Sequence, residues 1–418
     1  MPSSPPPDGP VDAATSHAEL LEEVAAVVAV PRRGPTDSFT LHAPLEVLAR
    51  AGLLVHLAPD HDDVARQRLA WVGTTFAATG TAWAPASAIV GAESTSAAVA
   101  LARLAAAVDA GEVDDADGWL EQAARTTSAE ELSAGLAAVV LPRLAGAGHG
   151  AIALHLLPRV APRSPVATGL LRGIVRELAR APERQLTWFH DRRPEASATD
   201  GGGVLEEVLR RPASPGDPGS TFIDPTMSLV ERSGLATELL AGPTGGLAVG
   251  EARRVLLRTA ARSMLQDDPA HAPYGWTHCL TMPQATLSIA RSCPSPADAV
   301  AVAATWVLGF RATLGGVDVA PRWVPAPDAV VPTDELLEHG PASAASTIWH
   351  APPTAVPELV RTVVATAAVH EDAHLAKYAL ACLDATRDDP GAGRLYLAAA
   401  AYLAAWWRSA DLAAAALV

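Results

Sequence analysis

The chain is nearly devoid of lysine, because Lys377 is the only lysine among its 31 basic residues. Aromatic residues make up only 5%, and valine and isoleucine rarely alternate with polar residues, which argues against β-sheet. No basic run exceeds two residues and the net charge is -15, so a nucleic-acid or anionic-membrane partner is not expected. The three cysteines lack paired spacing, which predicts a reduced, cytoplasmic setting.

Long apolar runs are also missing. The most apolar segment, LYLAAAAYLAAWW at residues 395–407, is shorter than the roughly twenty residues that a bilayer span needs. We therefore expect a buried C-terminal helix and no membrane partner. Residues 1–16 have neither the cationic start nor the apolar centre of a secretory signal, and they predict a disordered tail.

The abundant residues are alanine, valine and leucine, in a chain that is 49% hydrophobic and 18% charged. Helical spacing with Pro and Gly stop signals recurs throughout, so we predict an all-α fold with a substantial core. Pro- and Gly-rich stretches at 194–224, around one short helix, and at 315–356 interrupt this pattern. Because composition is similar on either side, we expect one large helical domain over residues 17–418 with long surface loops. The sequence does not predict an oligomeric state.

The single lysine follows two histidines in the stretch VHEDAHLAKYALACLDA, which we expect to lie within one long helix over residues 356–391. His370, His374 and Lys377 would then be spaced i, i+4 and i+7 and would share one helical face. One interpretation is a polar island inside the protein. The alternative is a solvated stripe, with Glu371 and Asp372 forming ordinary surface ion pairs.

The same stretch contains the pattern H-E-x-x-H, in which two histidines on a helix bind zinc and the glutamate acts as general base. A zinc metallohydrolase using His370, Glu371 and His374 is therefore an alternative function. It would need a third ligand, and no spacing rule selects one.

Three further histidines lie in distinctive local settings. His42 precedes Pro44 in LHAPLEVLARAG, His149 is flanked by glycines in GHGAIAL, and His278 begins HCLT. Taken singly, each fits a core or capping histidine better than a metal ligand. Only their convergence in the folded protein would indicate a shared site.

In this order, the segments LHAPLEVLARAG, GHGAIAL, HCLT and HLAK resemble the motifs of the questin oxidase-like family, over about residues 36–405. Proteins of this family oxidatively cleave anthraquinone-type rings in aromatic polyketide pathways. Leu41 stands where the family usually has asparagine. The resemblance implies a mononuclear non-haem Fe(II) site whose lysine is carboxylated by carbon dioxide to a carbamate. The implied ligands are His42, His149, His278, His374 and Lys377.

This resemblance gives a chemical reason for a single lysine. A buried lysine can lose its proton and react with carbon dioxide, whereas an arginine guanidinium stays protonated and cannot. Carboxylation would turn the side chain into an anionic oxygen ligand. Arginine could not replace lysine at position 377 without loss of that ligand.

The implied activity is oxidative C–C cleavage of a flat polycyclic aromatic substrate with dioxygen. Tyr274, Trp276 and Trp306 are candidates for lining its pocket. The family reaction is described both as an NADPH-consuming Baeyer–Villiger-type oxygenation and as a dioxygenation. The chain has no convincing nucleotide-binding motif, so NADPH would enter only as a co-substrate and we favour direct iron and dioxygen chemistry. A metal-free helical ligand-binding protein is the second alternative.

Overall fold

The computed structural model describes residues 15–33, 37–83, 95–162, 166–190, 201–216, 220 and 222–415. These residues form α-helices joined by turns, 3-10 helices and one long connection at residues 315–340, with one antiparallel pair of two-residue strands. The predicted all-α class is confirmed. Of the predicted disordered tail, residues 1–14 lie outside the described residues, and Ser16 already caps the first helix.

Contacts along the chain define two compact units. The first unit comprises Met1–Gln185 and Arg291–Pro294, and the second comprises Leu186–Ala290 and Ser295–Val418. Each unit has its own buried apolar core. The expectation of one domain over residues 17–418 stays a prediction.

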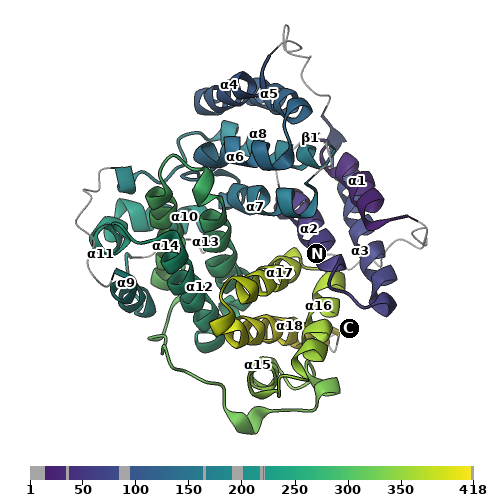
Figure 1. Cartoon of the computed structure of the whole chain (residues 1–418), viewed down its shortest axis with the longest axis vertical. Helices are drawn as coiled ribbons and strands as arrows, with labels where there is room; N and C mark the ends of the chain where they lie inside the picture. Colours follow the sequence, from purple (N-terminus) through teal and green to yellow (C-terminus); the bar gives the residue numbers. More distant parts are fainter. Residues whose placement is uncertain are drawn as a thin grey trace. The chain divides into compact units, whose positions relative to one another are not determined.

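The first unit begins with helices whose boundaries follow from local sequence (Figure 1). Ser16 accepts a hydrogen bond from the N–H of Glu19, and the Glu19 carboxylate accepts one from Ser16, which satisfies two backbone donors of the first helix. In chain order the elements are α1 (His17–Val28), β1 (Arg32–Arg33), α2 (Ser38–Leu54), α3 (Pro59–Ala78), β2 (Thr81–Ala82), α4 (Ala97–Ala110), α5 (Val113–Thr126), α6 (Ala129–Val140), α7 (Gly150–Val160) and α8 (Arg172–Arg180).

The second unit contains the remaining helices (Figure 1). They are α9 (Gly201–Arg210), α10 (Ile223–Arg232), α11 (Leu235–Thr244), α12 (Val249–Gln266), α13 (Thr277–Ile289), α14 (Pro296–Leu314), α15 (Pro341–His350), α16 (Val356–Val369), α17 (Ala373–Asp388) and α18 (Gly393–Ala415). Helix α9 is the short helix expected within residues 194–224. Helix α18 contains the apolar run at 395–407, and most of that run is buried, as predicted.

Helix α14 is mostly buried within the second unit and packs against α12 and α13. Among the described residues it is the one helix long and apolar enough to cross a membrane, and 83% of its most apolar window is buried inside the protein. A mostly buried core helix has the same length and apolar composition as a membrane-spanning helix.

One predicted helix is broken at the place where the candidate residues lie. Helix α16 ends at Val369 and α17 begins at Ala373, so residues 356–391 do not form one helix. The break occurs because Asp372 is the N-cap of α17 and accepts a hydrogen bond from the N–H of His374 at 2.7 Å. His370 lies outside both helices. The prediction that His370 shares a helical face with His374 and Lys377 is therefore wrong.

Candidate metal-binding histidines

Two histidines of the first unit lie side by side. His42 is on α2 and His149 immediately precedes α7, and their ring centroids are 4.7 Å apart with the planes at 76°. One ligand nitrogen of each ring lies within 4.8 Å of the other. His149 is only 1% exposed, and Nε2 of His42 is buried. Two side chains 107 residues apart in sequence thus meet in the interior of one unit.

The His42 ring is oriented by its own helix. Its Nδ1–H donates to the carbonyl oxygen of Ser38, one turn earlier, at 2.5 Å. Because a carbonyl oxygen can only accept, this contact places the proton of a neutral ring on Nδ1. Nε2 is then the nitrogen with a lone pair for a metal ion.

His149 is oriented by an unusual turn. Gly146, Ala147 and Gly148 all have positive φ angles of 62°, 54° and 67°. Ala147 is a non-glycine residue in this region, which costs of the order of 1 kcal/mol. The turn brings the carbonyl oxygen of Gly146 to 2.9 Å from Nδ1 of His149, so Nδ1–H donates there and Nε2 can ligate.

The second unit brings together His278, His374 and Lys377. His278 is on α13 and His374 on α17, with ring centroids 4.9 Å apart and planes at 78°. Lys377 follows His374 by almost one helical turn. Their exposed fractions are 6%, 6% and 4%, so a lysine head group and two imidazoles share one buried region.

A π-helical turn, Ala272–Trp276, precedes α13 and orients His278. The carbonyl oxygen of Tyr274 in this turn lies 2.5 Å from Nδ1 of His278 and accepts a hydrogen bond from Nδ1–H. Single π-helical turns are rare and often occur at functional sites because they realign side chains. Here the turn fixes the tautomer that presents Nε2.

Asp372 orients His374 in two ways. Its Oδ1 accepts from the backbone N–H and from Nδ1–H of His374, both at 2.7 Å. Its Oδ2 accepts from the hydroxyl of Tyr274 at 3.3 Å. Although burial opposes ionisation, the hydrogen bonds from His374 hold the pKa of Asp372 well below its usual value. The carboxylate therefore stays ionised and holds the ring.

Both histidines of the second unit are neutral at pH 7. Burial, followed by repulsion from His374 when that ring is protonated and from Lys377, lowers the pKa of His278 well below 6.5. Burial and the charge of Lys377 lower the pKa of His374 to about 4. Only a neutral imidazole can ligate a metal, so both rings are in the required state.

All four histidines follow one pattern. Each donates Nδ1–H to a carbonyl or carboxylate oxygen and presents Nε2. Metal-ligating histidines almost always donate their second ring N–H in this way, which fixes ring orientation and raises ligand basicity. Each unit thus has buried histidines that could hold a metal ion.

The zinc metallohydrolase interpretation loses its geometric basis. His370 lies outside α17, its Nδ1 accepts from the N–H of Asp372 at 3.0 Å, and its Nε2 is 3.4 Å from Asp411. Glu371 is exposed. The two histidines of H-E-x-x-H therefore do not project from successive turns of one helix.

The three candidate substrate residues have different surroundings. Tyr274 is 53% exposed and its ring edge meets His374, with centroids 5.0 Å apart. Trp276 and Trp306 are buried, and their indole N–H groups donate to the Asp268 carbonyl and the Thr286 hydroxyl. The role of all three in substrate binding stays a prediction.

The hydrogen-bond acceptors that orient the four histidines were not predicted from the sequence. Asp372 could have been found, because an Asp before an Ala-His pair at the start of an apolar helix is a capping signal. The backbone carbonyls of Ser38, Gly146 and Tyr274 gave no such signal. No family model, curated protein or solved structure matches the chain. The resemblance to questin oxidase-like proteins thus depends on the four short motifs.

Proposed function

We propose that the chain is a non-haem iron oxygenase whose metal ligands are His42, His149, His278, His374 and Lys377. The observation that supports this proposal is the shared Nδ1 pattern of the four histidines. A satisfied core histidine needs no particular nitrogen to be presented. Four rings with the same tautomer and buried neighbours are better explained by metal binding.

The donor set suits iron. Imidazole nitrogens bind Fe, Zn, Cu and Ni alike, and an oxygen donor shifts the preference toward harder ions such as Fe(II). Lys377 would supply that oxygen as a carbamate. Lys377 is only 4% exposed, so burial of its charged ammonium group is unfavourable. Carboxylation would replace the ammonium group with an anion that offsets the charge of the metal ion.

In this proposal the protein supplies orientation and the metal supplies dioxygen activation. Asp372 holds His374, and Tyr274 donates to Asp372 from a position open to solvent. A substrate with a phenol group could approach on the Tyr274 side, where an aromatic ring edge already meets His374. The substrate class is a quinone-like polycyclic aromatic compound, and NADPH is at most a co-substrate.

Oxygen consumption tests this function. The protein would be reconstituted anaerobically with Fe(II) and mixed with a hydroxyanthraquinone and dissolved dioxygen, with and without NADPH. We expect dioxygen uptake together with loss of the quinone absorbance. Uptake by the reconstituted chain that is no faster than uptake by free Fe(II), across several hydroxylated anthraquinones, would reject the activity.

Matched variants connect the activity to the proposed ligands. His149→Gln and His374→Gln should abolish uptake, whereas His155→Gln and His370→Gln, whose rings lie nearby in sequence but outside the proposed ligand set, should retain it. Circular dichroism and melting temperature would confirm that each variant is folded. Retention of activity in either ligand variant would contradict the assignment.

A further inference from the structure

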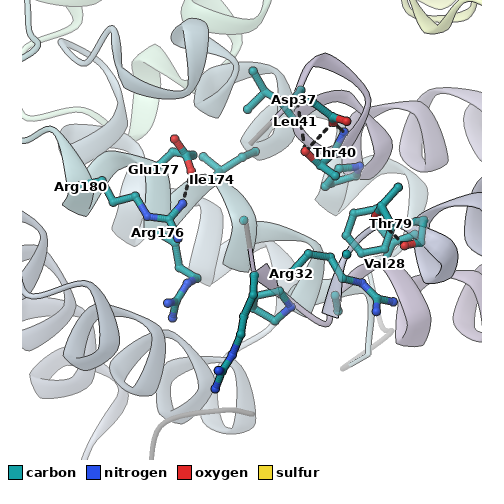
Figure 2. A pocket seen from close by; sticks show the side chains of 17 residues that line it. Val28, Arg32, Asp37, Thr40, Leu41, Thr79, Ile174, Arg176, Glu177 and Arg180 are labelled. Carbon is teal, nitrogen blue, oxygen red and sulfur yellow. Dashed lines mark hydrogen bonds and ion pairs between the residues drawn. The ribbon is translucent and has the colours of Figure 1, made fainter. Parts of the chain in front are cut away.

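The first unit contains a second candidate site, which we call the arginine pocket (Figure 2). It is a cavity of about 240 Å³ between α1, β1, α2, the end of α3 and α8. Four arginines line it: Arg32, Arg33, Arg176 and Arg180. Figure 2 shows Arg176 and Arg180 on one side of the cavity and Arg32 on the other.

Two of these arginines pair with no carboxylate among the residues that the structure describes. Among the described residues, Arg32 and Arg33 form no side-chain hydrogen bond or ion pair. Their guanidinium groups lie over aromatic rings, Arg32 at 5.1 Å from the Phe76 centroid and Arg33 at 4.7 Å from the Trp83 centroid. Nε of Arg32 is buried without a hydrogen-bond partner. The cation–π contacts position both guanidinium groups, and no described residue accepts a hydrogen bond from their N–H donors.

Arg176 adds a buried donor. Its side chain is 5% exposed, and it pairs with Asp117 and Asp114, each at 3.0 Å. Its Nε is buried and has no hydrogen-bond partner among the described residues. Because a buried N–H without an acceptor costs about 1–3 kcal/mol, a donor of this kind at the wall of a cavity favours binding of an anionic acceptor there.

The carboxylates that line the pocket are already engaged. Asp37 is the N-cap of α2, where its Oδ1 accepts from the N–H and the hydroxyl of Thr40 at 2.7 and 2.8 Å. Glu177 pairs with Arg180. The lining therefore has four guanidinium groups against two carboxylates, and the surplus positive charge comes from Arg32 and Arg33.

We propose that the arginine pocket binds a small anion bearing a carboxylate or phosphate group. Guanidinium groups offer paired N–H donors whose geometry matches both oxyanions. The volume is below the roughly 300–1,000 Å³ typical of sites for drug-sized ligands, so it suits a small acid better than a polycyclic substrate. An anion would also relieve repulsion between guanidinium groups that face one cavity.

This site is separate from the proposed iron ligands. Leu41 and Pro44 of α2 line the pocket, whereas His42 between them and His149 do not. The proposal therefore does not depend on the proposed oxygenase activity, and it can fail or succeed independently of metal binding.

Calorimetric titration of the full-length protein with inorganic phosphate and, separately, with malonate tests the proposal. The variants are Arg32→Gln and Arg33→Gln, which remove the guanidinium groups without breaking an ion pair to any described residue. Arg125→Gln is the control, because Arg125 lies in the same unit but outside the pocket and is 59% exposed. We expect saturable binding of at least one anion and a loss of about ten-fold or more in affinity in each pocket variant.

The possible results distinguish a phosphate site from a carboxylate site, and each of these from the absence of an anion site. Binding of phosphate alone or of malonate alone supports the site and identifies its preferred group. The affinity should fall at high salt and should be unchanged in Arg125→Gln. Absence of saturable binding of either anion up to about 10 mM, at low ionic strength, would overturn the proposal. Equal affinity in the parent protein and both pocket variants would also overturn it.

Discussion

Asp372 is the residue through which the account can be tested most finely, because it both caps α17 and holds His374. The substitution Asp372→Asn keeps a capping side chain, since Asn and Asp are about equally good N-caps. It removes the negative charge that accepts Nδ1–H of His374 at 2.7 Å. The two roles of the residue are thereby separated.

The expected magnitudes differ for the two roles. Loss of a group that orients a ligating histidine typically lowers metal affinity about 10–100-fold. Removal of an N-cap typically lowers the free energy of unfolding by roughly 1 kcal/mol. Because Asn can still cap α17, the metal-free Asp372→Asn variant should lose much less than this. Asp372→Ala removes both functions and should lower both quantities.

A competitive titration with a chelating indicator measures the metal affinity, and chemical denaturation of the metal-free protein measures the unfolding free energy. Asp268→Asn is the matched control, because Asp268 caps a short helix by accepting from the N–H of Ala270 and does not contact His374. Equal metal affinity in Asp372→Asn and the parent protein would show that the Asp372 carboxylate does not orient a metal ligand. The same loss of affinity in Asp268→Asn would equally contradict this role of Asp372.

Three further predictions follow from the same contacts. Lys377→Arg should lose iron binding and the signal of a ¹³C-labelled carbamate in NMR spectra, whereas Glu371→Gln should keep both; the reverse result would contradict the ligand assignment. Burial and Lys377 lower the pKa of His374 to about 4, below the 6.5 of the unfolded chain. Below pH 6.5 the unfolded chain therefore takes up a proton that the folded protein does not, so the contribution of His374 to stability should be fully present only above pH 6.5. The metal-free protein should lose roughly 3 kcal/mol as pH falls toward 4, and denaturation of His374→Gln should show a shallower loss. Asp117→Asn should cost about 3–5 kcal/mol in a thermal melt, because its buried carboxylate pairs with Arg172 and Arg176; a loss below about 1 kcal/mol would contradict a structural role for these ion pairs.

The sequence predicted the helices well because their apolar residues recur at helical spacing between recognisable caps. It failed at residues 370–372, where strong helix-forming segments flank the break. There the side chain of Asp372 competes for the N–H of His374 and ends the preceding helical pattern. Apolar periodicity does not depend on side-chain to backbone hydrogen bonds, so it could not predict this break between the two helices.

The candidate site was only partly predictable for a different reason. His374 and Lys377 are close in sequence, so helix geometry alone places them together. The pairing of His42 with His149 depends on how α2 packs against α7, which local spacing cannot give. The sequence shows that glycines flank His149, but the left-handed turn at Gly146–Gly148 and the acceptor role of the Gly146 carbonyl emerge only from the folded backbone.

The central claim is that His42, His149, His278, His374 and Lys377 hold iron. It is tested most directly by measuring bound iron per chain after anaerobic reconstitution and removal of excess Fe(II). The account predicts about one equivalent in the parent protein and a large loss in both His149→Gln and His374→Gln, because each substitution removes one of the proposed ligands. Less than about a tenth of an equivalent in the parent protein would contradict the claim, as would full occupancy in either variant.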